Sequence, residues 1–138
     1  MKRVILIAAF LVVASVMSAG AAVYTFQPYP TDLRDLDHFR YITWGINWEH
    51  RNERITEAVL TFTNIWNWRH ERNVLYTHLL DNPRLGTRYY WDYQGGGDNF
   101  AGQGAMVGTW SDPIGGRSTG FDLTYRFSDL GLLGILNS

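Results

Sequence analysis

The chain has 138 residues, with 12 basic and 13 acidic side chains and no cysteine. This length predicts a single compact domain. The formal charge of −1 argues against a nucleic-acid-binding protein, because phosphate recognition is normally accompanied by a surplus of basic residues. Without a thiol the chain has no disulfide, no thiolate zinc site and no cysteine nucleophile.

The first 21 residues have the pattern of a secretory signal peptide. Lys2 and Arg3 precede an apolar run of 14 residues, and Ala19-Gly20-Ala21 supplies the small residues of a cleavage site. The alternative is an uncleaved anchor, but a membrane-spanning helix needs about 20 apolar residues. Cleavage after Ala21 leaves residues 22–138, with ten basic and thirteen acidic groups and a net charge of −3. No later segment is apolar enough to span a membrane, so we expect a secreted or cell-surface domain.

Five segments have the composition or the alternation of β-strands. They are residues 39–46, 55–63, 74–80, 105–110 and 121–127. The first is rich in aromatic and β-branched residues, and the third ends at the turn signal Asp81-Asn82-Pro83. Residues 55–63 and 121–127 alternate apolar and polar positions, which is typical of a half-buried strand. In the former, we expect Ala58, Leu60 and Phe62 to share one face.

Short strands separated by turns, with no repeated alternation of helix and strand, predict an all-β sandwich of jelly-roll type. The segment 95–120 contains nine glycines, which disfavour a helix there. At the C-terminal end, Ser128 and Asp129 could cap a short helix over residues 130–136. Only two residues follow this apolar run. Two alternatives therefore stay open: a domain that lacks its last strand, and a C-terminal helix that packs on the sandwich.

The densest acidic segment is residues 32–38, where Asp35 and Asp37 could offer oxygen ligands to calcium. Interrupting leucines and the lack of a turn glycine depart from the calcium-loop pattern. The alternative is a turn in which the aspartates cap backbone amides and pair with Arg34 or Arg40. We therefore expect no obligatory cofactor, with Asp35 and Asp37 as candidate calcium ligands.

No catalytic motif is recognisable in the chain. Its four histidines lack the spacing of a zinc protease, and the serines after the signal peptide lie in no Gly-x-Ser-x-Gly elbow. Two carboxylates that face each other across a sugar would define a glycosidase, but no sequence feature pairs any two acids. The glycine-rich loop 95–104 lacks the lysine and the following helix of a phosphate-binding loop. The protein is therefore predicted not to be an enzyme.

Clusters of aromatic residues beside amides, carboxylates and arginines are the strongest functional signal. Trp66 and Trp68 would lie on the same side of an extended chain, and Tyr90 and Trp91 belong to a second cluster. Such flat rings can stack on the apolar face of a pyranose while polar neighbours bind its hydroxyl groups. The alternative is that the rings form the core of a domain without disulfides. These four residues are the candidate contacts to a polysaccharide or matrix component.

One combination of segments is distinctive. It comprises the signal peptide, Asp35-Leu36-Asp37-His38 followed by residues 41–46, residues 55–62, Leu79-Leu80-Asp81 and Gly96-Gly97-Asp98. Together they resemble secreted bacterial β-sandwich proteins of the type sorted by a PEP-CTERM signal. The resemblance implies an extracellular or envelope role and transfers no catalytic residues. It also implies a domain that continues past Leu136 to an anchor helix with basic residues, which this sequence does not contain.

Three functions follow from these features. The first is a non-catalytic extracellular or cell-envelope module that binds polysaccharide through exposed aromatic residues. The second is a structural surface protein that acts through self-association. The third is an extracellular hydrolase, which would need two acids that converge in a cleft. We expect no nucleic acid among the partners and no membrane span in the mature chain.

Overall fold

The computed structural model describes residues 20–33, 36, 38–93 and 95–138. This part of the chain forms six strands and one short helix: β1 (Arg40–Gly45), β2 (Val59–Ile65), β3 (Asn73–Leu79), β4 (Gly86–Trp91), β5 (Ala105–Asp112), β6 (Phe121–Arg126) and α1 (Leu133–Leu136). The strands pair antiparallel as three two-stranded ribbons, β1–β4, β2–β6 and β3–β5. The all-β class predicted from the sequence is therefore confirmed.

Each of the five predicted strand segments overlaps one strand, but β4 was not predicted. Bulky residues fill positions 87–91 without a clean alternation, and the strand pairs with β1 along all six of its residues. β2 begins only at Val59. Before it, the N–H and carbonyl of Ile55 bond to the Asn137 side chain, with N···O distances of 2.8 and 2.9 Å. The structure thus departs from the sequence prediction in two places, the additional strand β4 and the later start of β2. Both places have partners that are far away in the chain.

The buried apolar core lies between the β2–β6 and β3–β5 ribbons. Its three buried side chains in the described part are Val107 of β5, Phe127 just after β6 and Leu132 just before α1. Half-buried residues packed against them are Ala58, Leu60, Leu79, Ala105, Tyr125, Leu133 and Leu136. The Tyr125 ring lies against Gly108 of β5, where any Cβ atom would collide with it. A glycine in this strand therefore lets the two ribbons approach.

The alternation predicted for residues 55–63 is confirmed. Ala58 and Leu60 pack against the core, Phe62 is half-buried, and Val59 and Thr61 are exposed. The cross-strand neighbours follow the same alternation, since Thr61 pairs with Thr124 of β6 and their hydroxyl oxygens lie 3.1 Å apart.

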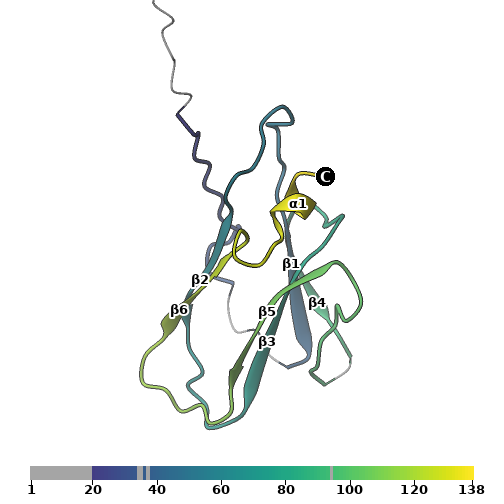
Figure 1. Cartoon of the computed structure of the whole chain (residues 1–138). Helices are drawn as coiled ribbons and strands as arrows, with labels where there is room; N and C mark the ends of the chain where they lie inside the picture. The colour runs from purple at the N-terminus through teal and green to yellow at the C-terminus, as the bar shows by residue number, and fades with distance from the viewer. Residues whose placement is uncertain (1–19, 34–35, 37, 94) are drawn as a thin grey trace, which may run out of the picture.

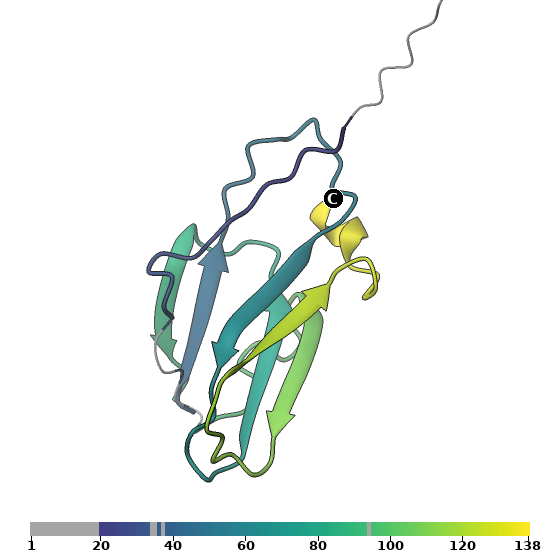
Figure 2. The same cartoon turned by 90° about the vertical axis from the view of Figure 1, so that its left-hand side faces the viewer.

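Two views show the arrangement of the ribbons. The β2–β6 ribbon lies in front of β3–β5 in Figure 2, with β1–β4 to one side of them. In both views the β2–β3 and β5–β6 connections lie together at the end of the molecule opposite α1 (Figures 1 and 2). Segments far apart in the sequence therefore meet at that end.

The helix α1 contributes to the core through Leu133 and Leu136. The predicted cap by Ser128 and Asp129 is wrong, because the residue before the helix is Leu132 and no side chain caps it. Ser128 instead donates its hydroxyl to the Glu57 carboxylate at 2.8 Å and so joins the turn after β6 to the segment before β2.

Residues 1–19, which include most of the predicted signal peptide, lie outside the described residues. Among the residues that are described, no helix has the length and apolar character needed to cross a membrane.

Candidate functional site

An open hollow of about 310 Å³ lies beside the β1–β4 ribbon. Its lining residues come from β1, β4, the β3–β4 connection and the glycine-rich loop: Tyr41, Thr43, Leu80, Asn82, Pro83, Arg84, Tyr90 and Phe100. We call this site the aromatic hollow. Its volume is at the lower end of the range of small-ligand sites, about 300–1,000 Å³.

Strand pairing builds the aromatic wall of the hollow. Tyr41 of β1 and Tyr90 of β4 are directly opposite in the ladder, so their side chains lie on the same face of the ribbon. Their rings stack with centroids 4.9 Å apart and an angle of 17° between planes. Phe100 packs edge-on against Tyr41, with centroids 5.2 Å apart. Contact with Tyr41 therefore restricts the side-chain conformations of both Tyr90 and Phe100.

A histidine–aspartate pair holds Phe100 in this position. His78 Nε2 lies 2.9 Å from Asp98 Oδ1, and the His78 side chain is only 5% exposed. The other ring nitrogen of His78, Nδ1, lies 3.2 Å from the carbonyl oxygen of Gln103. Asp98 Oδ1 also accepts the backbone N–H of Phe100 at 3.1 Å. Both ends of the loop around Phe100 are therefore bonded to one β3 side chain.

The two ring nitrogens of His78 each face an oxygen atom that accepts hydrogen bonds. A neutral imidazole carries one N–H and can donate only one of these bonds, whereas the imidazolium donates both. The sequence predicted that the loop 95–104 forms turns and is not a phosphate site. In the structure, the contacts of His78 with Asp98 and Gln103 hold this loop against β3.

The candidate residues Tyr90 and Trp91 lie on opposite faces of the β1–β4 ribbon. Successive residues of a strand alternate, and Trp91 is opposite Arg40 in the ladder. The Arg40 guanidinium lies 4.6 Å from the centre of the Trp91 ring, and Trp91 is 54% exposed. Tyr90 therefore lines the aromatic hollow, and Trp91 belongs to a separate surface.

The candidate residues Trp66 and Trp68 lie in the β2–β3 connection. Both are about half exposed, at 52% and 53%, while Asn67 between them is buried. This is the alternation expected of an extended chain. Arg69 lies over the Trp68 ring, 4.9 Å from its centre. In the described part of the chain, no ring contact joins these two indoles to Tyr90 or Trp91.

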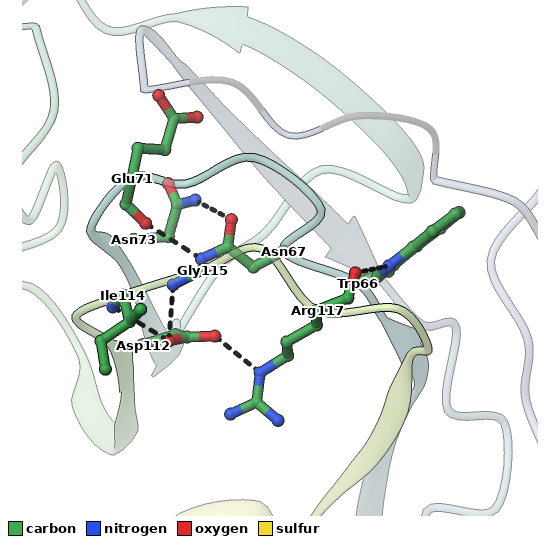
Figure 3. A network of polar contacts seen from close by, with 8 residues as sticks. All are labelled: Trp66, Asn67, Glu71, Asn73, Asp112, Ile114, Gly115 and Arg117. Carbon is green, nitrogen blue, oxygen red and sulfur yellow. Dashed lines mark hydrogen bonds and ion pairs between the residues drawn. The ribbon is translucent and has the colours of Figure 1, made fainter.

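Polar contacts beneath Trp66 tie two connections together, and we call them the Asp112 network (Figure 3). Asn67 Nδ2 donates to the carbonyl of Glu71 at 3.1 Å, and its Oδ1 accepts from Asn73 at 2.7 Å. The Trp66 indole N–H donates to the carbonyl of Arg117 at 2.8 Å. Figure 3 shows the indole extending outward from the network. The buried amide thus positions the connection that carries the indoles.

Asp112 is the charged member of the network and is itself buried. Its carboxylate accepts the Arg117 Nε–H at 2.6 Å and the backbone N–H groups of Ile114 and Gly115 at 3.2 and 3.0 Å. The bond from Arg117, followed by the bond from Gly115, lowers the pKa of Asp112 to about 2. A carboxylate so fully bonded is held in place and is not poised to exchange protons near neutral pH.

A smaller cluster joins the N-terminal segment to the β1–β2 connection. The Tyr24 hydroxyl donates to the Glu53 carboxylate at 2.9 Å, and this bond raises the pKa of Tyr24. The Tyr24 ring also lies 4.0 Å from the His50 ring and packs edge-on against Trp48. Three aromatic rings and one acid therefore attach residues 20–33 to the body of the domain.

The candidate calcium ligands Asp35 and Asp37 lie outside the described residues. Within residues 20–33, 36, 38–93 and 95–138, no group of three or more His, Cys, Asp or Glu side chains is placed to hold a metal ion.

Sequence reasoning identified Tyr90 but missed the residues that surround it. Tyr41 was assigned only to a strand, Asn82 to a turn and Phe100 to the glycine-rich loop, and Arg84 was not singled out. The signal that could have found Tyr41 is its strand register opposite Tyr90, which requires β4 to be recognised first.

Comparison of the chain with protein-family models, with curated proteins and with solved structures finds no match in any of the three.

Proposed function

We propose that this protein is a non-catalytic extracellular or cell-envelope module, a β-sandwich of jelly-roll type, that binds polysaccharide in the aromatic hollow. The observation that carries the proposal is the stacked pair Tyr41–Tyr90, which lines the same open hollow as Asn82 and Arg84. The location outside the cell rests on the predicted signal peptide.

The chemistry of the lining suits a sugar ring. Aromatic rings offer a large apolar surface with little conformational freedom to lose, and the C–H face of a pyranose is the complementary apolar surface. The amide of Asn82, the hydroxyl of Thr43 and the guanidinium of Arg84 can bond the hydroxyl groups at the edge of the ring. Small-ligand sites commonly combine an apolar wall with a few polar groups in this way.

The exposed indoles extend the same chemistry beyond the hollow. Trp68 and Trp91 each have one neighbouring arginine over the ring and are about half exposed. Because Trp91 faces away from the hollow, these rings would bind other stretches of the polymer and not the units next to the one in the hollow. They are secondary contacts, because neither Trp68 nor Trp91 lines the hollow.

Binding to a panel of soluble glycans, measured by affinity electrophoresis, tests the proposal. Tyr90→Ala should lower affinity at least tenfold, since it removes one ring of the stacked pair that lines the hollow. Tyr89→Ala is the matched control, because Tyr89 lies on the other face of the same strand. Thermal unfolding of both variants checks that the fold is intact. Retention of wild-type protein on no glycan, or equal loss in both variants, would contradict the proposal.

Export can be tested separately from binding. Expression of the full chain in a bacterial host, followed by N-terminal sequencing of the exported protein, should give a mature chain that begins at Ala22. Recovery of the intact chain in the cytoplasm would remove the extracellular part of the proposal and leave the binding part to be judged by the glycan experiment.

Self-association is a second candidate function. Every described strand pairs on one side only, and open strand edges can pair with another chain. Val59 of β2 and Met106 of β5 also expose much of their side chains. Sedimentation at increasing concentration should then show dimers or larger species, whereas a monomer throughout would contradict this candidate.

A further inference from the structure

We infer that the polysaccharide is acidic, and that Arg84 binds the carboxylate of a uronic acid unit whose ring lies against Tyr90. This inference rests on the proposed function and adds the substrate class. Four observations support it: the charge of the lining, the state of Arg84, the geometry of a uronate ring and the distribution of arginines around the exposed indoles.

The lining of the aromatic hollow carries positive charge only. Its eight residues include one arginine and no acid. The nearby carboxylate of Asp98 is already bonded to His78, at 2.9 Å, and Asp81 is not part of the lining. A ligand group in the hollow therefore meets a cation without a competing carboxylate from the wall.

Arg84 forms no ion pair with any residue that the structure describes. Arg117 and Arg126 differ, since each has a carboxylate partner, at 2.6 and 4.0 Å. A guanidinium has five N–H donors and no acceptor, so its natural partner is an anion with two oxygens. Bidentate bonds between arginine and a carboxylate are shorter and about twice as strong as bonds between neutral groups.

A uronate can satisfy both sides of the hollow at once. Its carboxylate projects from the edge of the pyranose ring, so the two faces of the ring stay free to stack. A ring placed against Tyr90 would leave its edge free to meet Asn82 and Arg84, which line the same hollow from the β3–β4 connection. A neutral hexose fills the same space but leaves the guanidinium without an anion.

The arginines beside the exposed indoles suit a polymer with repeated negative charge. Arg40 over Trp91 and Arg69 over Trp68 lie 4.6 and 4.9 Å from the ring centres. Neither guanidinium has a carboxylate partner in the described part of the chain. The net charge of −3 predicted for the mature chain acts against binding only weakly, because exposed charges more than about 8 Å apart are screened at physiological ionic strength.

Paired polymers test this inference. Polygalacturonate and alginate are each compared with the same polymer after reduction of its carboxylates to primary alcohols, by calorimetry on the mature chain. We expect at least one acidic polymer to bind about tenfold more tightly than its reduced form. Arg84→Gln should remove that difference, which corresponds to about 1.4 kcal/mol, and should leave binding of the reduced polymer unchanged.

The matched control is Arg72→Gln. Arg72 precedes β3 and Arg84 follows it, and a strand of seven residues is about 23 Å long. Arg72 is exposed and does not line the hollow, so its loss should change affinity less than twofold. An equal loss in both variants would mean unspecific attraction and would overturn the inference.

The remaining outcomes separate the inference from the proposed function. If acidic and reduced polymers bind equally well and Tyr90→Ala abolishes both, the choice of uronate is wrong and polysaccharide binding stands. If the wild-type protein binds neither these polymers nor any glycan of the panel, both are wrong.

Discussion

The two halves of the molecule are held together by different means. The ribbons β2–β6 and β3–β5, with α1, contain all three buried apolar side chains of the described part, Val107, Phe127 and Leu132. The β1–β4 ribbon contributes none of them. Its contacts are the Tyr41–Tyr90 stack and the pair of Arg40 with Trp91. One half is stabilised by burial, and the other presents its aromatic rings at the surface.

This difference bears directly on function. A ring in the core contributes its apolar area to stability and is closed to ligands. On β1–β4, Tyr89 and Trp91 are exposed, and Tyr41 and Tyr90 are half-buried beside the hollow that they line. The half that contributes least to the core therefore carries the aromatic hollow. The predictions below compare the two halves, beginning with the largest expected effect.

Phe127→Ala should cause the largest loss of stability, about 3–5 kcal/mol, because it removes a buried ring and leaves a cavity. Phe39→Ala makes the same chemical change just before β1, where the side chain is 46% exposed, and should cost less than about 1 kcal/mol. Urea unfolding of both variants measures the difference. Similar losses of stability in the two variants would contradict the conclusion that the two halves are stabilised by different means.

Gly115→Ala should cost about 2–3 kcal/mol, from the left-handed backbone and the loss of the close approach. Gly115 has φ +66°, and a Cβ atom there would collide with the carbonyl of Arg69. Gly131→Ala is the control, because Gly131 has φ +70° and open space around it. We expect it to cost about 1 kcal/mol. If thermal unfolding gave equal losses of stability for both variants, the left-handed backbone alone would account for the cost. The close approach of Gly115 to Arg69 would then contribute nothing.

Asp112→Asn should remove a contribution to stability that depends on pH. The pKa of Asp112 is about 2 in the folded protein and 3.8 in its ordinary state. Because the folded pKa is the lower one, the contribution is fully present above pH 4 and is lost as the pH falls from about 4 to about 2. Urea midpoints of wild type and variant should therefore converge over this range.

Arg40→Gln should have the smallest effect, about 0.5 kcal/mol, because an exposed cation beside an aromatic ring contributes little. The measurement is the urea midpoint at low and high salt. A loss of 2 kcal/mol or more would mean that the β1–β4 ribbon depends on this pair and would reduce the contrast with the core.

Strand positions were largely predictable because they depend on local alternation. Ala58 and Leu60 face the core as their spacing predicts, and the turn after residue 80 lies where Asp81-Asn82-Pro83 places it. β4 was not predictable, because residues 86–91 have no alternation of their own and become a strand only beside β1. The cap of α1 was predicted wrongly, since Ser128 bonds to Glu57, 71 residues away in the chain.

For the candidate site, the sequence identified aromatic residues beside polar ones, but it did not show which of these residues lie together in space. Aromatic residues beside polar ones were visible as clusters, and Trp66 and Trp68 are exposed on the two sides of a buried Asn67. Neighbours in sequence were separated by the structure, because Tyr90 and Trp91 point to opposite faces of one strand. His78 and Asp98, which hold Phe100, are 20 residues apart and share no motif.

By itself, the sequence determined that this is an all-β protein without disulfides and rich in aromatic residues. It also located five of the six strands in the described part of the chain. Those properties follow from composition and from contacts within a few residues. Only the tertiary structure decided which rings are buried, which pair across strands and which line the same hollow as Arg84. Such choices depend on the register between strands and on bonds such as His78–Asp98, and these form only when distant parts of the chain meet.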